Sequence, residues 1–437
     1  MKNCNESKLT SISKLALSTL LAASLFTSCQ EEPVSDNDTS PSTSGESAVE
    51  PPSSDGDIIP GQFIVVFKDS KIKPASKFHA KTIFPSRGAK AKATRDVSAL
   101  AMKKMNTILS DNDLEQSQVL EYYTTKISGV AMQLKEEEYQ KLLKDSNVAA
   151  IEYDRTVTLP KYEIEDSFTD DNLGQKKAQS IPCGVSNAGG AVDSSEREQW
   201  IWVIDSGIDL DHPDLNVVTN PEYARSFVGG TPNDCNGHGT HVAGTAAAID
   251  NGIGVIGVSA GAAVVPVRVF GCNGNSSTST ILAGINHVGR FDAPGDVANL
   301  SLGGLSGASC ASTSAYINSI LSLGNSGTLV AIAAGNSSAN AAGYEPACIN
   351  GNNIYTVASM TCGGSFSSFS NFNMNPIDVI ATGSSVLSTY LNGGYATLSG
   401  TSMASPHVAG IMHARGGAPR VSGSVRNRGE NYPIAVR

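Results

Sequence analysis

Three polar residues of this chain are of the types that could together cleave an acyl bond. Asp205 ends the apolar run "WIWVID", His238 lies in "GHGTHVAGT" where a loop should pass into a helix, and Ser402 lies at the start of an apolar helix. A serine hydroxyl is a weak nucleophile until an imidazole accepts its proton, and that imidazole needs a carboxylate to fix its tautomer. The three residues therefore suit nucleophilic catalysis if the fold brings them together.

The surrounding segments predict an α/β fold that could do so. Short apolar runs such as "WIWVIDSG", "AAVVPVRVF", "VANLSLGG", "TLVAIAAGN" and "NIYTVASM" alternate with helical stretches and Gly-rich loops. Such alternation predicts a parallel central sheet that is flanked by helices on both faces. Ligands and catalytic groups of these sheets gather at the carboxyl ends of the strands, where Asp205 lies.

Three motifs carry a family resemblance. "VIDSGID", "NGHGTHVAGT" and "SGTSMASPHVAG", in this order, resemble the subtilisin-like serine proteases (peptidase family S8), and the loops look most like the proteinase K and aqualysin branch. The resemblance covers a catalytic domain over 181–411 and implies that Asp205, His238 and Ser402 are catalytic. It implies a serine endopeptidase of broad specificity that acts on protein and peptide substrates. His241 is interpreted as a structural residue of the helix.

Further site residues follow from the same resemblance. "AIAAGN" resembles the oxyanion segment of the family, so Asn336 would donate to the oxyanion together with the backbone N–H of Ser402. A plain turn residue is the alternative for Asn336. The two walls of the S1 pocket would be Ser301, Leu302, Gly303 and Gly304 on one side and Ala333, Ala334 and Gly335 on the other. These walls carry no charge, so we hypothesise a preference for apolar or aromatic P1 residues. The stretch 274–285 takes the place of the other substrate-binding strand and helix.

A smaller lysine-rich domain precedes the chemistry. Residues 60–160 read as strand, helix, strand, helix and strand, at 61–70, 96–110, 126–134, 135–146 and 148–159. This small α+β domain resembles the inhibitor-type (I9) propeptide of the family, a folding chaperone whose tail blocks the active site until it is cleaved. Residues 161–180 are polar and non-periodic, so they predict a processing linker. We expect the processing site between Leu159 and Ile181.

The N-terminus has the layout of an export signal. Lys2, Lys8 and Lys14 precede the apolar run "LALSTLLAASLF", which is too short for a membrane-spanning helix. Cys29 follows small residues, as in bacterial lipoprotein signals, so 1–29 would be a signal with Cys29 as the lipidation site; an ordinary secretory signal is the alternative. Residues 30–59 predict a flexible linker. We expect a secreted or cell-envelope protein that meets a membrane only through its lipid anchor.

Charge excludes one class of partner. The net charge is −10, every lysine lies at or before Lys177, and 178–411 contains only Arg197, Arg225, Arg268 and Arg290 as basic residues. Without a basic surface, nucleic acid is not an expected partner. We expect a monomer.

Six cysteines follow the signal, and an even number in an exported chain predicts disulfides: Cys183, Cys235, Cys272, Cys310, Cys348 and Cys362. The resemblance implies a Cys235–Cys272 bond. Cys348–Cys362 is a weaker assignment that would leave Cys183 with Cys310.

No cofactor is required for the predicted chemistry, and the cysteines lack the CxxC spacing of zinc sites. "EPACI" followed by Asp378 resembles a structural calcium site of the family, built from carbonyls and one carboxylate. A solvated aspartate explains Asp378 equally well.

The resemblance ends near Ile411. Gly416, Gly417 and Pro419 should break the serine-bearing helix, and 412–437 has no periodic apolar face but five arginines. We expect this atypical tail to be unfolded, as in a frameshifted or truncated reading frame; a native basic tail is the alternative. An unfolded tail would favour a second function, a non-catalytic envelope protein that binds peptides through an inactive protease domain. A lipase-type esterase is excluded, because the residues around Ser402 lack the second glycine of a nucleophile elbow and the order of the three residues differs.

Overall fold

The computed structural model describes residues 56–160, 162, 164–168, 179–305, 310 and 314–437. All of them belong to one compact unit. The predicted signal at 1–29, its Cys29, and most of the linker over 30–59 lie outside the described residues.

The N-terminal domain is an antiparallel sheet covered by helices. Its sheet contains β1 (Ile58–Phe67), β2 (Val119–Tyr123), β3 (Gly129–Gln133) and β4 (Val148–Thr158), in the order β4-β1-β3-β2. Its helices are α1 (Ala75–Phe78), α2 (Arg87–Asp111), the 3₁₀ helix η1 (Gln116–Gln118) and α3 (Glu136–Leu142). The sequence analysis did not predict β2. It also placed the start of α2 too late, because the side chain of Ser86 caps the helix well before its apolar face begins.

The predicted parallel sheet is confirmed in the catalytic domain. Its strands, in spatial order, are β20 (Arg420–Asn427), β21 (Glu430–Val436), β17 (Ile377–Thr382), β16 (Ile354–Met360), β14 (Leu329–Ala333), β12 (Val297–Leu300), β7 (Ile201–Asp205), β10 (Val264–Arg268) and β8 (Arg225–Ser226). Every neighbouring pair is parallel except β20 and β21. Both faces are apolar, so both need a cover of helices.

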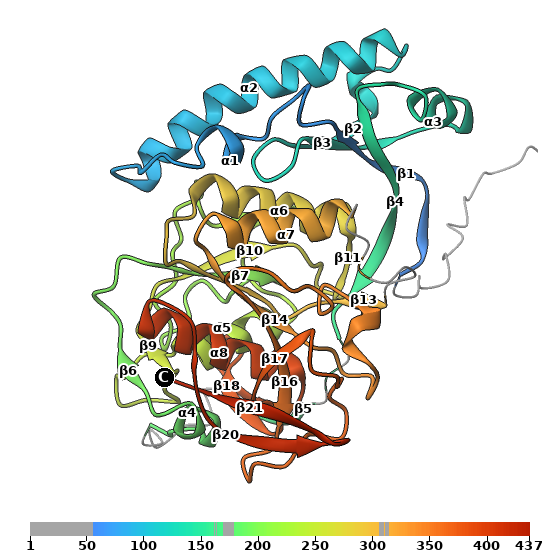
Figure 1. Ribbon diagram of the computed structural model, residues 1–437. Helices are drawn as coiled ribbons and strands as arrows, with labels where there is room; N and C mark the ends of the chain where they lie inside the picture. The colour runs from blue at the N-terminus through green and yellow to red at the C-terminus, as the bar shows by residue number, and fades with distance from the viewer. Residues whose placement is uncertain (1–55, 161, 163, 169–178, 306–309, 311–313) are drawn as a thin grey trace, which may run out of the picture. The chain divides into compact units, whose positions relative to one another are not determined.

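Helices cover the two faces of this sheet (Figure 1). On one face lie α5 (His238–Ala247) and α8 (Thr401–Arg415), which share a core with the strand residues Val203 and Ala331. On the other lie α6 (Thr278–Phe291) and α7 (Ala315–Asn325), which pack with Trp202 and Ile332. The two helices that begin at or beside candidate catalytic residues, α5 and α8, are therefore neighbours.

Short elements complete the domain. They are α4 (Cys183–Asn187), β6 (Val192–Asp193), β9 (Ser259–Ala260), β11 (Asn275–Ser277), β13 (Gly304–Leu305), η3 (Ala341–Gly343), β15 (Tyr344–Glu345), β18 (Val386–Thr389) and β19 (Tyr395–Leu398). The linker supplies one more strand, β5 (Ile164–Phe168), which forms a three-stranded sheet with β18 and β19. This strand departs from the prediction of an unpatterned linker over 161–180.

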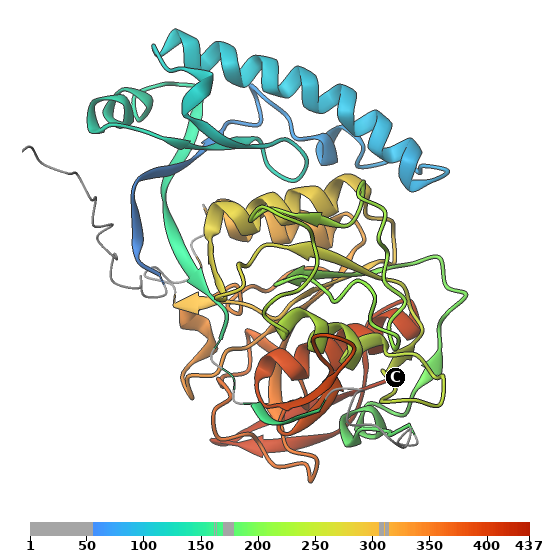
Figure 2. The same ribbon diagram turned by 180° about the vertical axis from the view of Figure 1, so that it is seen from behind.

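The N-terminal domain docks on α6 and α7 (Figures 1 and 2). Asp154 accepts the Ser279 N–H at 3.0 Å near the start of α6, and Glu152 accepts the Ala315 N–H at 2.8 Å at the start of α7. Carboxylates are favourable at helix N-termini because they satisfy free N–H groups and meet the positive end of the helix dipole. Beyond these caps, β4 extends to pair with β11 of the catalytic domain.

The prediction that 412–437 is unfolded is wrong. The chain leaves α8 through Gly416, whose φ of +67° gives a left-handed helix cap, and then forms the β20–β21 hairpin. Strand β21 extends the central sheet beside β17, and Tyr432 is fully buried against Ile377 and Ile380. Only Val425, Tyr432 and Ala435 of the two strands are buried. The hairpin therefore contains no run of apolar residues long enough to predict a strand. The hypothesis about the reading frame stays a prediction, which resequencing of the DNA tests.

The structure corrects two disulfide assignments and confirms one. Cys235 bonds Cys272, as predicted. The other pairs are Cys183–Cys362 and Cys310–Cys348, in place of Cys348–Cys362 and Cys183–Cys310. Helix α4 brings Cys183 to the end of β16, where Asn187 donates to the Cys362 carbonyl at 3.1 Å. This pairing depends on tertiary packing, which spacing along the chain does not reveal.

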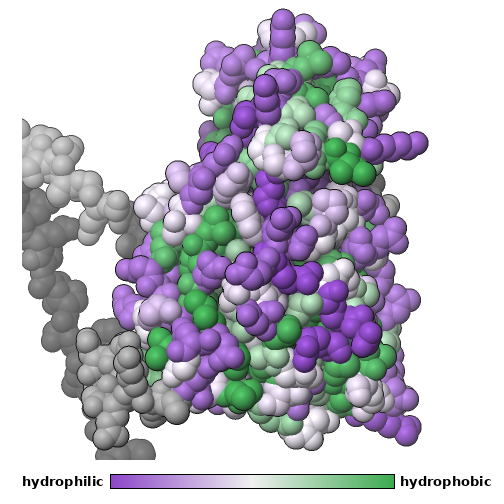
Figure 3. All heavy atoms as spheres, turned by 90° about the vertical axis from the view of Figure 1, so that its left-hand side faces the viewer, coloured by the Kyte–Doolittle hydropathy of each residue, from purple (hydrophilic) through white to green (hydrophobic). Residues whose placement is uncertain are grey.

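One face of the molecule is seen in Figure 3, where hydrophilic and hydrophobic side chains are interspersed. Among the residues that the structure describes, no helix is both long and apolar enough to cross a bilayer.

Candidate active site

Asp205 and His238 form a buried pair. Asp205 is the last residue of β7 and His238 the first residue of α5, and both are fully buried. His238 Nδ1 lies 2.8 Å from Asp205 Oδ1 and 3.0 Å from Oδ2. Because a carboxylate accepts hydrogen bonds, Nδ1 is assigned as the donor, and in the neutral imidazole Nε2 then presents a lone pair.

A second carboxylate holds the loop before His238. Asp234 is buried and accepts the Ser206 hydroxyl at 3.0 Å, the Gly237 N–H at 3.0 Å and the Thr240 hydroxyl at 2.7 Å. These bonds fix the start of α5 against the turn after β7. Sequence reasoning missed Asp234; its position just before "CNGHGTH" was the only available signal.

Ser402 lies in the first turn of α8. It is 1 % exposed, and its Oγ donates to the Ser301 carbonyl at 3.3 Å. His238 Nε2 has no hydrogen-bond partner among the described residues, so the Ser402–His238 bond is not formed in this state. Hydrogen bonds of catalytic groups commonly tighten only when substrate binds.

Asn336 is held by Thr401. Its Oδ1 accepts both the N–H and the hydroxyl of Thr401, each at 2.8 Å, which directs the amide Nδ2 away from that residue. A Cβ placed on Gly400 would lie 3.1 Å from this Nδ2. The amide group of Asn336 therefore lies against the turn before Ser402. The backbone N–H of Ser402 belongs to the first turn of α8, so it has no acceptor within the helix.

The predicted walls lie on the two strands next to this turn. Ser301 and Leu302 are buried and follow β12, whereas Gly303 and Gly304 are partly exposed. Ala333, Ala334 and Gly335 form the end of β14 and the following turn. Ser301 also donates to the Ser402 carbonyl at 2.8 Å, a contact that sequence reasoning missed.

The chain's own linker passes this site. Strand β4 pairs antiparallel with β11, and the N–H of Leu159 donates to the Gly274 carbonyl at 2.8 Å. Three residues later, the ring of Tyr162 lies 5.3 Å from the His238 ring, and its hydroxyl donates to Asn236 Oδ1 at 3.0 Å. Tyr162 therefore places the linker against the His238 face of the site.

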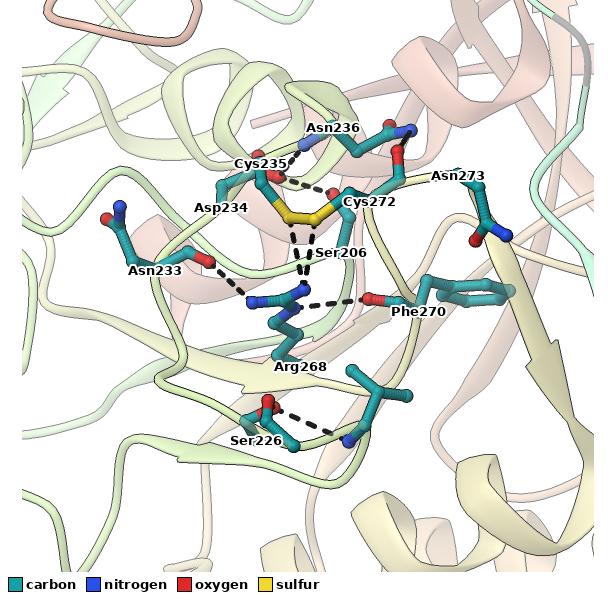
Figure 4. Close-up of a disulfide and its surroundings, with 12 residues drawn as sticks. Ser206, Ser226, Asn233, Asp234, Cys235, Asn236, Arg268, Phe270, Cys272 and Asn273 are labelled. Atoms are coloured by element: carbon teal, nitrogen blue, oxygen red, sulfur yellow. Dashed lines mark hydrogen bonds between the residues drawn. A yellow bond between two sulfur atoms is a disulfide. The ribbon is translucent and has the colours of Figure 1, made fainter. Parts of the chain in front are cut away.

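The Cys235–Cys272 disulfide joins two loops of the site (Figure 4). One loop leads into His238 and the other into β11. The Arg268 guanidinium contacts both sulfurs, at 3.0 and 3.5 Å, and Asn236 donates to the Cys272 carbonyl at 3.1 Å. The bond therefore ties the histidine loop to the strand that β4 occupies.

His241 is structural, as interpreted from the sequence. It is fully buried, its Nε2 lies 2.9 Å from the Val386 carbonyl, and burial lowers its pKa to about 3. It therefore stays neutral and faces the β18–β19 hairpin.

Asp378 lies on β17, away from the candidate catalytic residues. It accepts the Thr356 N–H at 2.8 Å, and the Thr356 hydroxyl in turn donates to the Ala347 carbonyl of "EPACI" at 3.1 Å. Burial raises the pKa of Asp378 to about 6. Asp378 is partly buried, and its carboxylate and the Ala347 carbonyl, which both bond to Thr356, are hard oxygen donors of the kind that suits calcium. No cluster of three metal-binding side chains occurs among the described residues.

The fold and this site define a class. A serine at a helix start, an Asp–His pair at the end of a parallel strand, and an N-terminal domain whose tail crosses the site are the features of a subtilisin-like serine endopeptidase made with an inhibitory propeptide.

Comparison with known proteins agrees with that class. A profile of the subtilase family matches residues 196–414, and one of peptidase inhibitor I9 matches 62–160. The extracellular serine proteinase of Thermus sp. (strain Rt41A) is 33 % identical over 359 residues, which cover 80 % of this chain and 79 % of that protein. The M-protease of Shouchella clausii (strain KSM-K16) is 36 % identical over 313 residues, or 70 % of this chain and 73 % of that one. The crystal structure of a cold adapted subtilisin-like serine proteinase is similar with 33 % identity and a TM-score of 0.49, covering 56 % of this chain and 91 % of that one. The chain belongs to the subtilase family.

Proposed function

We propose that this endopeptidase hydrolyses peptide bonds through Asp205, His238 and Ser402. The observation that carries the proposal is the buried hydrogen bond from His238 Nδ1 to Asp205, which leaves Nε2 as the basic nitrogen. In the reaction, Ser402 Oγ attacks the peptide carbonyl while Nε2 accepts its proton. Asp205 then stabilises the imidazolium, which returns the proton to the leaving amine.

Two donors would stabilise the tetrahedral intermediate. Asn336 Nδ2 and the N–H of Ser402 both lie at the Gly400 turn, and neither is used by a described residue. Donors that are already fixed in place cost no reorganisation when charge develops on the oxygen. Thr401 fixes the amide of Asn336 before substrate arrives.

The chain acts first on itself. The β4–β11 pairing and the Tyr162–His238 contact support a cut between Leu159 and Ile164, inside the wider window that the sequence predicts. Until that cut, the propeptide fills the site and acts as an intramolecular inhibitor.

A comparison of three chains tests these roles. Wild type, Ser402→Ala and Ser405→Ala are followed by intact mass and by cleavage of an unfolded protein substrate. Ser405 lies on the same helix, and its Oγ donates to Asn299 at 2.8 Å, so it is a matched control outside the proposed chemistry. We expect wild type and Ser405→Ala to process themselves and Ser402→Ala to remain intact and inactive. Processing of the Ser402→Ala chain would refute the proposal.

The uncharged walls support a preference for apolar or aromatic P1 residues. Ser301 to Gly304 and Ala333 to Gly335 offer no carboxylate to a basic side chain. A series of otherwise identical peptide substrates tests this proposal. A higher kcat/KM for Lys or Arg than for Phe or Leu at P1 would contradict it.

We assign calcium a structural role at Asp378, and no cofactor to the reaction. The partly buried carboxylate and the Ala347 carbonyl, which share Thr356 as a partner, would be among the ligands of the ion, and the ion would neutralise the charge of Asp378. The melting temperature, measured with calcium and with a chelator, tests this role, and we expect it to be higher with calcium.

The protein is proposed to work outside the cytoplasm as a monomer, with protein rather than nucleic acid as its partner. The signal-like N-terminus supports export, and lipidation of Cys29 would hold the protein at the cell envelope. Cys29→Ser should shift the protein from the membrane fraction to the medium, and light scattering measures the oligomeric state.

The non-catalytic alternative loses its main support. It depended on an unfolded tail, and 420–436 instead forms a hairpin on the central sheet.

A further inference from the structure

Strand β5 of the linker pairs with the edge of β19 (Figure 1). The pairing is antiparallel and runs from Ile164 opposite Leu398 to Phe168 opposite Tyr395. Strand β19 leads directly toward Ser402 along the chain, so its antiparallel partner β5 leads away from Ser402. Ser399 also donates a hydrogen bond to the Glu165 carboxylate.

The far end of β5 enters an apolar pocket. The ring of Phe168 stacks on Tyr395 with 5.6 Å between centroids and 26° between planes. Phe168 also packs against a cluster that contains Ala248 and Val255, both buried, and lies with Leu387 at its margin. Tyr395 is itself 2 % exposed, and its hydroxyl donates to Asp214 at 3.3 Å. Tyr395, Ala248, Val255 and Leu387 together form the aromatic pocket that receives Phe168.

The described residues of the linker make three contacts along the site. The chain pairs antiparallel with β11 as far as Leu159, Tyr162 lies beside His238, and β5 pairs antiparallel with β19 up to Phe168. Pairing with an exposed strand edge recognises an extended backbone and leaves sequence preference to the side-chain pockets.

We propose that the edge of β19 and the aromatic pocket bind the part of a substrate that follows the scissile bond. The ligand is an extended polypeptide strand of at least five residues with an aromatic side chain at its far end. This inference rests on the proposed function, because it places the scissile bond at Ser402. It also follows that residues 164–168 stay bound after a cut between 159 and 164, since they remain attached to the catalytic domain. They block this half of the site until a second cut after Phe168.

Acyl transfer tests the site directly. In the test enzyme, Ile164→Gly, Glu165→Ser, Asp166→Gly and Phe168→Gly are combined, so that its own strand no longer competes. A peptide methyl ester acylates Ser402, and the amino group of an added peptide then attacks the ester carbonyl. The C–Oγ bond breaks, Oγ regains a proton, and a new amide forms in competition with hydrolysis by water. The ratio of amide to acid product measures binding of the acceptor.

Three acceptors give the comparison: Tyr-Glu-Ile-Glu-Asp-Ser-Phe, the same peptide ending in Ala, and the tripeptide Tyr-Glu-Ile. We expect the first to give an amide-to-acid ratio about three- to tenfold above the second, as stacking on Tyr395 predicts, and the tripeptide to fall lower still. Equal ratios with continued release of methanol would overturn the inference and leave the proposed function intact. A lack of methanol release would instead count against the proposed function.

A second measurement needs no turnover. In the Ser402→Ala chain, hydrogen exchange of the amides at 395–398 is compared with that in the same chain carrying Phe168→Ala or Ile164→Ala. Ile164 is 50 % exposed and lies outside the aromatic pocket, so it is the matched control. We expect about three- to tenfold faster exchange with Phe168→Ala alone. If Phe168→Ala does not accelerate exchange, or if Ile164→Ala accelerates it equally, the proposed role of the aromatic pocket in binding is wrong.

Discussion

A buried ion pair between the propeptide and the catalytic domain leads to a quantitative prediction. The Lys126 side chain is 1 % exposed, and its Nζ lies 2.6 Å from Ser326 Oγ and 3.4 Å from Asp292 Oδ2. Burial lowers the pKa of Lys126 to about 8. Burial alone would raise the pKa of Asp292, but Lys126 and Lys90 outweigh it and hold that pKa at about 2. Asp292 is thus a buried carboxylate that depends on the cations of the propeptide.

Lys126→Met keeps the aliphatic stem and removes the charge. Breaking a buried pair costs about 3–5 kcal/mol because the partner charge stays buried. In this variant Asp292 keeps its ion pair with Lys90 and the hydrogen bond from Thr328 at 2.6 Å. Because these partners remain, we predict a smaller loss of about 2–3 kcal/mol in the free energy of unfolding.

Urea unfolding of the Ser402→Ala chain measures this loss by tryptophan fluorescence. Both tryptophans report on the interface, because Arg87 Cζ lies 3.9 Å above the Trp200 ring and Trp202 donates to Asp296, the partner of Arg87. Lys141→Met is the control, since Lys141 pairs with the exposed Asp113 and should matter little. A Lys126→Met loss no larger than that of Lys141→Met would refute the reasoning.

Three further perturbations probe the catalytic domain. Asn336→Ala should lower kcat by about 10²–10³ with little change in KM, as loss of an oxyanion donor does, and steady-state kinetics measures both. The raised pKa of Asp378 means that its deprotonation opposes folding, so stability without calcium should fall by up to about 3 kcal/mol as pH rises from 4 through 6. Asp378→Asn should therefore raise the Tm at pH 8 in chelator and lower it in calcium; a shift of the same sign in both would remove the calcium assignment. The double variant Cys235→Ser/Cys272→Ser should lose about 3–4 kcal/mol in the free energy of unfolding, because the bond closes a loop with a sequence separation of 37 residues. Its kcat/KM should also fall, and an unchanged kcat/KM would show that the bond does not support the site.

The catalytic core was predictable because its signals are local. Strands β7, β10, β12, β14 and β16 are short apolar runs, and burial on both faces requires such runs. The motifs around His238 and Ser402 each place a polar residue at the start of an apolar helix, which is also their position in the structure.

The errors concern contacts between distant segments. The partner of Cys183 depends on where α4 packs, and the β20–β21 hairpin depends on an open edge at β17. Strand β5 is mostly exposed and owes its form to pairing with β19, so no periodic pattern marks it. Pairing of this kind is set by tertiary context rather than by intrinsic preference.

The central claim is that Ser402 is the nucleophile, and covalent labelling tests it most directly. The processed enzyme is titrated with a sulfonyl fluoride, residual activity is recorded, and peptide mapping locates the adduct. We predict one adduct per molecule, on Ser402 within 398–410, with activity falling in proportion to labelling. An adduct on another serine that tracks the loss of activity, or full activity in the labelled enzyme, would contradict the mechanism.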